Sequence, residues 1–328
     1  MQNEISNTRS IIETGIMIAI LVAIMLFPSL GLLLYIIAPT AVALIYVRNG
    51  AKYSVAAVSI ALILGFVFIG LLNIIQIGPI LPFVGIPLGY CIKNKKKPVK
   101  TIIYLSIGFF IVIFINIFIV PLFMYSNGAI GLVDYAVKSL NESLKTAKNI
   151  YLNAGISNDV INQMGTSTIT SLDIFEVIPP LMILSAAFLG AISYKITELV
   201  FRRLNIPMEK RRNFTYFFAP NRMVAFLIIF TCIGLMLQAK NMIIGDYIYI
   251  TGINIATVLL SLDAIAYIAY FLRQRFKMPK ALIIIIILIL ITILNNSFIL
   301  IGFIDTIFDF RKLDPNRIGK NKVNKYGK

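Results

Sequence analysis

The chain has 328 residues, of which 59% are hydrophobic and 13% charged, and its mean hydropathy is +0.90. A soluble domain carries about 25% charged residues, so this composition excludes an ordinary water-soluble protein and predicts an integral membrane protein. The net charge of +16 comes from short basic blocks between apolar stretches, a pattern typical of topology signals and lipid headgroup contacts rather than of nucleic-acid binding.

Apolar runs of about 18 or more residues are long enough to cross a bilayer as helices. We therefore predict an all-α fold, a polytopic transmembrane helical bundle of about 8–10 spans. The first run lacks a small-residue cleavage site, so we interpret it as a retained span and not as a signal peptide. The candidate spans are residues 11–30, 31–47, 53–73, 75–92, 101–124, 174–197, 222–239, 248–272 and 281–303.

The first span carries small residues at positions four apart, namely Gly15, Ala19 and Ala23. Residues spaced in this way share one helix face, on which a second helix backbone can approach closely. That second helix belongs either to the same chain or to a partner protein, and the spacing alone fits both.

Prolines and glycines concentrate in the run from Gly78 to Gly89, which reads GPILPFVGIPLG. This run predicts an irregular or closely packed helix near a central cavity, because irregular backbone is tolerated at membrane depth only where it is buried or lines a cavity. Three amides in the neighbouring spans are candidate substrate-binding residues: Asn73, Gln76 and Asn116. The structural alternative is that these amides only join helices through hydrogen bonds.

The connection of residues 125–172 is long and is predicted to contain an amphipathic helix. Its apolar residues between Val133 and Tyr151 recur at spacings of three and four, while lysines occupy other faces. This helix either lies flat on the outer leaflet or acts as a lid over an outward-facing cavity.

Basic residues mark every second connection between the spans. They cluster at 48–52, 93–100, 195–222 and 273–280, while the intervening turns hold few. The positive-inside rule places these clusters and the N-terminus in the cytoplasm, and residues 125–172 outside. Richness in Ile, Lys and Asn is typical of AT-rich bacterial genomes, so we expect a multi-pass protein of a bacterial plasma membrane.

Asp263 lies in the middle of the predicted span 248–272. A carboxylate there costs about 2.5–3.5 kcal/mol on insertion scales unless it is paired or protonated. It is a candidate for binding a substrate, a cation or a proton, and the alternative is that it joins helices by hydrogen bonds.

The stretch from 281 to 310 is interrupted by Asn295 and Asn296. It forms either two short spans or a re-entrant hairpin, or else one tilted span that continues into an interfacial helix. A turn back would return the basic tail, residues 311–328, to the cytoplasm, and this is the arrangement we favour.

Several kinds of site are not expected in this chain. It has no histidine and two cysteines far apart, Cys91 and Cys232, which argues against imidazole catalysis and metal sites. It also lacks a phosphate-binding loop and a dinucleotide fingerprint. We therefore predict no catalytic residues, no metal, no cofactor and no enzymatic activity.

Three segments carry a family resemblance: Glu13–Ile24, Tyr35–Gly50 and the C-terminal GFIDTIFDFR from Gly302 to Arg311. They resemble the YybS-like family of bacterial membrane proteins of undefined function. The C-terminal motif, with Gly302, Asp305, Asp309 and Arg311, is its most specific part.

Residues 1–197 are also similar to the six-helix S components of energy-coupling-factor vitamin transporters. In those proteins an A-x-x-x-A stripe on the first helix docks a transmembrane coupling subunit, and Ala19 and Ala23 match it. This resemblance implies a small-molecule site at the outer ends of the first six spans, beneath residues 125–172. The additional spans after 197 depart from a bare S component.

The chain is therefore expected to comprise an S-component-like membrane domain (1–197), a basic cytoplasmic loop (198–221), additional transmembrane helices (222–310) and a basic tail (311–328). The leading hypothesis is that it binds or transports a small molecule, as a subunit of an importer with a coupling subunit and ATPases. The alternatives are a membrane scaffold that recruits a partner through the basic loop and tail, and an intramembrane enzyme that uses Asp263.

Overall fold

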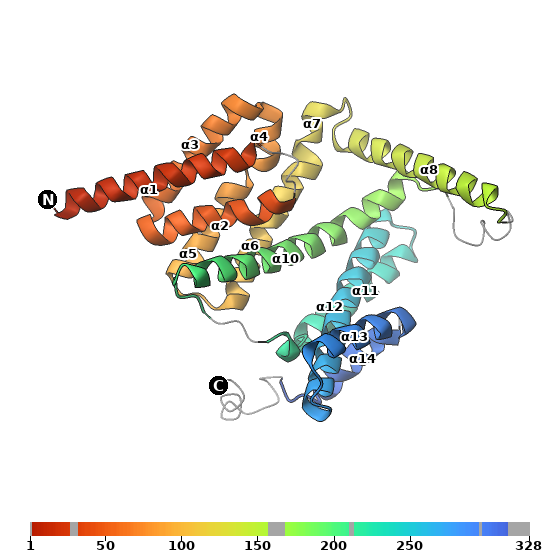
Figure 1. Ribbon diagram of the computed structural model, residues 1–328. Helices are drawn as coiled ribbons and strands as arrows, with labels where there is room; N and C mark the ends of the chain where they lie inside the picture. The colour runs from red at the N-terminus through yellow and green to blue at the C-terminus, as the bar shows by residue number, and fades with distance from the viewer. Residues whose placement is uncertain (1, 27–31, 157–167, 210–212, 295–296, 314–328) are drawn as a thin grey trace. The chain divides into compact units, whose positions relative to one another are not determined.

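The computed structural model describes all residues except 1, 27–31, 157–167, 210–212, 295–296 and 314–328 (Figure 1). Every regular element in the described residues is helical, so the predicted all-α class is confirmed. The chain divides into two compact units, residues 1–210 and 211–328, which are described separately below.

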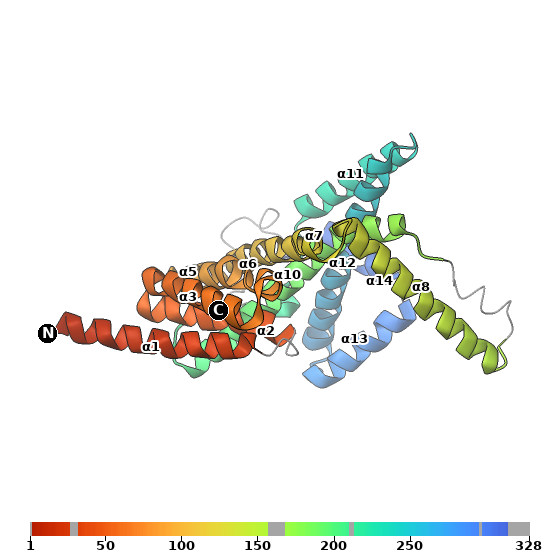
Figure 2. The same cartoon turned by 90° about the horizontal axis from the view of Figure 1, so that it is seen from above.

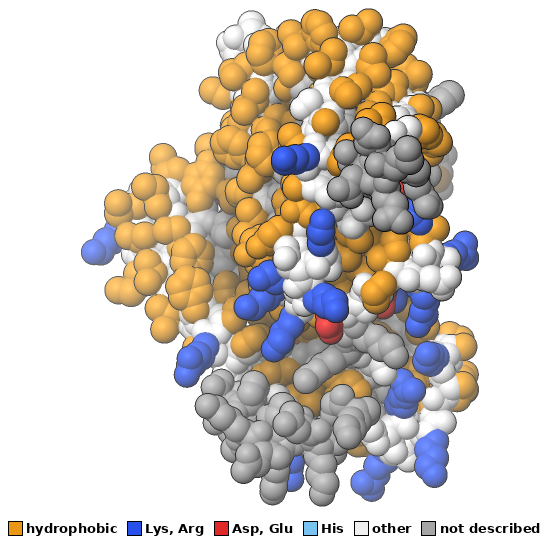
Figure 3. All heavy atoms as spheres, turned by 90° about the vertical axis from the view of Figure 1, so that its left-hand side faces the viewer, with side chains coloured by type: hydrophobic (Ala, Val, Ile, Leu, Met, Phe, Trp, Pro, Cys, Tyr) orange, Lys and Arg blue, Asp and Glu red, His pale blue; other side chains and the backbone are white. Residues whose placement is uncertain are grey.

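Six described helical stretches are long and apolar enough to cross a bilayer: 51–69, 71–93, 98–124, 171–203, 221–238 and 243–275. A bent pair of helices near the C-terminus adds a further candidate, and two shorter apolar helices lie at 10–25 and 34–49. These stretches correspond to the nine predicted spans, although the junction between the first two lies outside the described residues. In Figure 3 apolar side chains cover much of the face shown, and Lys and Arg side chains gather in groups on it. An extensive apolar surface is expected where a protein contacts lipid.

The first unit is built from helices whose breaks fall at prolines and glycines. Its α-helices are α1 (Gln2–Met25), α2 (Leu32–Asn49), α3 (Ala51–Ile69), α4 (Leu71–Ile77), α5 (Ile86–Lys93), α6 (Pro98–Phe114), α7 (Pro121–Met124), α8 (Ala129–Asn153) and α10 (Ser171–Arg203). Two π-helical segments, η2 (Leu81–Gly85) and η3 (Ile115–Ile119), interrupt the spans 71–93 and 98–124.

The proline- and glycine-rich run was correctly predicted to be irregular and closely packed. It contains η2, and a Cβ added at Gly89 would collide with the Tyr46 side chain of α2. A Cβ on Gly108 of α6 would collide with the Phe83 carbonyl oxygen in η2. Glycine therefore allows three neighbouring helices to approach at backbone distance.

The core of the first unit lies among α1 to α6, with η2, and α10. Its largest fully buried side chains include Phe109, Tyr194 and Phe201. The only polar contact described between α2 and α10 within this core is a hydrogen bond of 2.8 Å between the hydroxyls of Thr40 and Thr197. Helix packing rather than charge therefore holds this unit together.

The amphipathic helix predicted within 125–172 is confirmed as α8. Figures 1 and 2 show that it runs across the direction of α10 instead of along it. Its first half is joined to the start of α10, because Asn141 exchanges two hydrogen bonds with Ile169 and Asp134 accepts one from Ser171. In the second half, Ile150 and Tyr151 are exposed.

The second unit starts with the short helix η4 (Phe214–Tyr216) and a helical hairpin of α11 (Asn221–Gln238) and α12 (Ile243–Arg275). Small residues set the spacing of the hairpin: a Cβ on Gly234 would meet the Tyr249 backbone, and a Cβ on Gly252 would meet Thr231. The same antiparallel register places Asp263 opposite Ala219, and these two residues are hydrogen-bonded. Asp263 thus lies at the level where α11 begins, within the second half of α12.

The C-terminal stretch forms two helices, α13 (Lys280–Leu294) and α14 (Ser297–Phe308), bent by 115° around residues 295–296. With 15 and 12 residues they extend about 22 and 18 Å, and neither matches a bilayer core of about 30 Å. Contacts of Gly302 with Leu260, of Thr306 with Asp263 and of Phe310 with Tyr267 show that α14 runs parallel to α12. The chain therefore turns back within this stretch.

The positive-inside rule places the end of α12 that carries Arg273 and Arg275 on the same side of the membrane as the basic connection 93–100. Because α14 returns toward that end, we predict that the C-terminus lies on this side as well. A green fluorescent protein fused after Lys328 should fluoresce, and alkaline phosphatase fused there should be inactive, as in matched fusions after Lys97. An active C-terminal phosphatase would contradict the turn back.

Candidate functional site

Three charged side chains from two distant segments meet inside the second unit. Arg311 Nη2 lies 2.6 Å from Asp263 Oδ1 and 2.7 Å from Asp305 Oδ2, and Arg311 Nε donates to Asp305 Oδ2 at 2.9 Å. All three side chains are fully buried. We call Asp263, Asp305 and Arg311 the buried charge cluster.

Backbone and hydroxyl groups bond to Arg311 and Asp263, while Asp305 Oδ1 is buried without a hydrogen-bond partner among the described residues. Arg311 Nη1 donates to the carbonyl oxygens of Phe217 (2.7 Å) and Thr215 (3.3 Å). Asp263 accepts from the Ala219 N–H at 3.2 Å and from the Thr306 hydroxyl at 3.3 Å. These bonds offset part of the cost of removing the charges from water.

The C-terminal motif positions Arg311 by its local geometry. Gly302 lets α14 approach α12, because a Cβ there would collide with the Leu260 carbonyl oxygen. Asp305 follows three residues later on the same helix face. Asp309 then adopts a left-handed φ of 47°, and its side chain accepts from the Leu313 N–H at 2.7 Å. This turn ends the helix and directs Arg311 back onto Asp305.

The cluster contains two carboxylates and one guanidinium, so it has one net negative charge when both carboxylates are ionised. An unpaired buried charge is costly, and uptake of one proton would neutralise the cluster. No group of three or more metal-ligating side chains occurs among the described residues. The chemistry that this arrangement offers is therefore charge pairing and proton binding.

The other predicted substrate-binding residues lie in the first unit. Asn116, in η3, donates to the carbonyl oxygens of Val112 (2.9 Å) and Gln76 (3.1 Å) and is also hydrogen-bonded to Tyr35. Asn73 donates to the Ile69 carbonyl oxygen at 2.7 Å. The structure thus brings Gln76 and Asn116 together, whereas all partners described for Asp263 belong to the second unit.

The small-residue stripe of α1 is uncovered by the described residues. Gly15, Ala19 and Ala23 are all exposed, and a Cβ added at Gly15 would find no heavy atom within 4 Å. Close packing of the stripe against another helix is therefore not observed among the described residues of the first unit.

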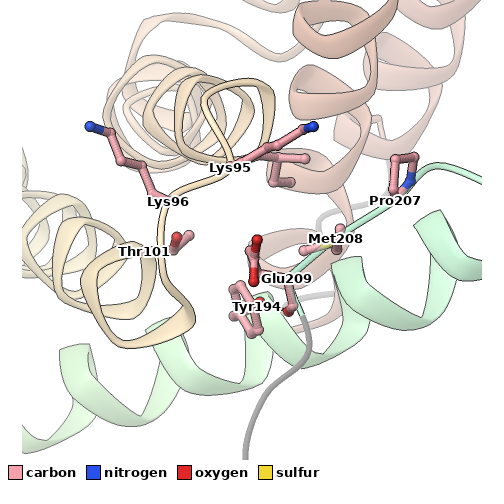
Figure 4. A pocket seen from close by; sticks show the side chains of 8 residues that line it. Lys95, Lys96, Thr101, Tyr194, Pro207, Met208 and Glu209 are labelled. Carbon is pink, nitrogen blue, oxygen red and sulfur yellow. Dashed lines mark hydrogen bonds between the residues drawn. The ribbon is translucent and has the colours of Figure 1, made fainter.

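The first unit also contains a cavity of about 380 Å³ between the α5–α6 connection and the end of α10. Figure 4 shows Thr101 and Tyr194 beside it, with the ammonium groups of Lys95 and Lys96 directed away from each other. This cavity lies at the basic end of the unit. The likeness to S components implies a small-molecule site at the opposite end.

The free-energy cost of a charge within the membrane pointed to Asp263, and the family motif pointed to Arg311. Nothing in the sequence connected the two residues. Sequence reasoning also missed the carbonyl groups of Thr215 and Phe217 and the hydroxyls of Tyr35 and Thr306. Carbonyl groups carry no sequence signal, whereas Thr306 lies four residues after Gly302 on the same face of α14 and could have been noted.

The family model described as "Predicted membrane protein (DUF2232)" matches residues 15–306. The match spans parts of both compact units and ends before Arg311. No curated protein and no solved structure matches the chain.

Replacing Arg311 with Gln should lower the free energy of unfolding by about 3–5 kcal/mol, because two buried carboxylates would lose their shared counter-charge. Lys312→Gln, which alters the exposed neighbouring residue, should change it by less than about 0.5 kcal/mol. Denaturant titration in detergent micelles measures both variants. Equal stabilities of the two variants would show that the cluster does not stabilise the fold.

Proposed function

The chain belongs to the family of predicted membrane proteins described as DUF2232, and on this premise we propose that it binds a small molecule for import together with a separate coupling subunit. The first unit would bind the ligand, and α1 would dock the partner. The chain has no ATP-binding signature, so ATPases attached to the partner would supply the energy. The protein itself would perform no catalysis.

The observation that carries this proposal is the uncovered stripe on α1. Most exposed residues of membrane helices are large and apolar, because they face lipid, and Ile12, Ile16 and Ile20 beside the stripe are of this kind. Gly15, Ala19 and Ala23 form a shallow track between them. Small residues on an open face favour close contact with another helix, and no described helix of the first unit occupies that face.

A second observation concerns the irregular segments of the ligand-binding unit. The π segments η2 and η3 lie in neighbouring spans, and η3 presents Asn116 next to Gln76 and Tyr35. π segments within helices often occur at functional sites, and convergent polar groups in apolar surroundings are typical of ligand sites. These residues support a ligand site on the side of the unit where α8 connects α7 to α10.

A scaffold function is the second candidate, and the buried charge cluster favours it. Arg311, the first residue of the predicted basic tail, bonds to Thr215 and Phe217, which belong to the predicted basic loop 198–221. The loop and the start of the tail are thereby held together. One combined basic surface of this kind would suit an acidic cytoplasmic partner.

The docking proposal predicts that the double substitution Ala19→Leu and Ala23→Leu abolishes most of the partner recovery. Overpacking a close helix contact costs about 1–3 kcal/mol, which corresponds to a loss of affinity of about 5- to 150-fold. The matched control, Ile16→Leu with Ile20→Leu, alters exposed neighbours and should retain the partner. Recovery of the coupling subunit and ATPase with the purified protein is measured by mass spectrometry.

Two results together would contradict the importer proposal. One is wild-type protein that recovers neither a coupling subunit nor an ATPase. The other is the absence of any ligand-induced thermal shift across a panel of vitamins.

Charge reversal at Arg202, Arg203, Arg211 and Arg212 separates the two candidate functions. For an importer subunit, we expect lower membrane insertion or stability with retention of the coupling subunit, because the basic loop mainly fixes topology. Loss of a cytoplasmic partner at normal insertion would favour the scaffold instead. Quantitative co-purification with a membrane-fraction control distinguishes these results.

A further inference from the structure

A second cavity lies within the second unit, between the segment before α11 and the end of α12. Its volume is about 220 Å³, and its lining residues are Asn213, Thr215, Tyr216, Tyr270, Arg273 and Gln274. The proposed import function does not involve this cavity.

The side chains around this cavity have an unusual chemistry in common. Each carries a hydrogen-bond donor, none is acidic, and Arg273 supplies the only formal charge. No carboxylate among the described residues forms an ion pair with Arg273. A guanidinium with surrounding amide and hydroxyl donors matches the oxygen atoms of a phosphate group.

The wall of the cavity is held in place by its neighbours. Tyr216 and Tyr270 pack edge to face with ring centroids 6.1 Å apart. The Thr215 carbonyl oxygen accepts from Arg311 Nη1, so the buried charge cluster fixes the backbone on one side. The donors therefore need little rearrangement to bind a ligand, which favours affinity.

The location of the cavity points to a lipid as the source of the phosphate. Arg273 lies ten residues beyond Asp263, about 15 Å along α12 past the level where α11 begins. Exposed apolar side chains follow in the same part of the chain: Phe271 on α12, Phe276 directly after it and Ile284 on α13. Acyl chains therefore have apolar surface nearby. Tyrosines and basic residues together are typical of the headgroup region.

One electrostatic effect opposes an anion at this place. The C-terminal end of α12 carries partial negative charge from the helix dipole. Arg273, Arg275 and Lys277 lie at that end, and their full positive charges outweigh a partial charge. The field at the cavity therefore favours an anion.

From these observations we infer that the cavity binds the phosphate group of an anionic phospholipid headgroup, with Arg273 as the principal contact. Delipidated full-length protein in detergent is titrated with phosphatidylglycerol or with phosphatidylcholine, and the thermal unfolding midpoint is recorded. Phosphatidylglycerol should stabilise the wild type at much lower mole fractions than phosphatidylcholine. Arg273→Gln should require about tenfold or more phosphatidylglycerol for the same shift.

Arg275→Gln is the matched control, because it removes the same charge from the same helix end but from a residue outside the cavity lining. It should weaken the response far less than Arg273→Gln does, because it changes only the local field, and Arg273→Lys should fall between the wild type and Arg273→Gln. Equal responses of Arg273→Gln and Arg275→Gln, or of wild type to the two lipids, would overturn the inference. A shift produced by soluble glycerol phosphate and dependent on Arg273 would overturn the lipid as the source.

Discussion

The second unit depends on the position of one guanidinium group, that of Arg311, between the carboxylates of Asp263 and Asp305. This group joins α12, α14 and the segment before α11, which lie far apart in the sequence. Removing three charges from water is costly, and hydrogen bonds to their remaining polar atoms offset part of this cost. The carbonyl groups of Thr215 and Phe217, the Ala219 N–H and the Thr306 hydroxyl provide such bonds, while Asp305 Oδ1 is buried without a partner in the described part of the chain.

The two units are stabilised by different means, and this difference suits different roles. In the first unit, glycines such as Gly89 and Gly108 bring helices together, and irregular π segments present polar groups. Its α1 leaves a track of small residues uncovered. In the second unit, buried charges fix the return of α14 and the loop before α11. A unit with an open docking face fits the proposed import function, whereas a unit that holds the loop before α11 against Arg311 fits the scaffold candidate.

Features that depend on local periodicity could be predicted from the sequence. The apolar runs, the amphipathic α8 and the irregular Gly78–Gly89 run follow from composition and spacing alone. Partners distant in the sequence could not be predicted, because hydropathy does not show which helices meet. The free-energy cost of a charge within the membrane pointed to Asp263, but its partner Arg311 lies 48 residues away. The register of α12 against α11, which places Asp263 at the level of Ala219, could not be predicted either. Likewise, whether the Gly15–Ala23 stripe is covered depends on packing and not on the stripe itself.

The central claim is that Arg311 and Asp263 stabilise the second unit through each other. A double-mutant cycle with Asp263→Asn, Arg311→Gln and both together, measured by denaturant unfolding in detergent, tests this claim directly. We predict that the two substitutions are strongly non-additive, with a coupling free energy of about 1.5 kcal/mol or more, as for other close charge pairs. Additivity within about 0.5 kcal/mol would contradict the account.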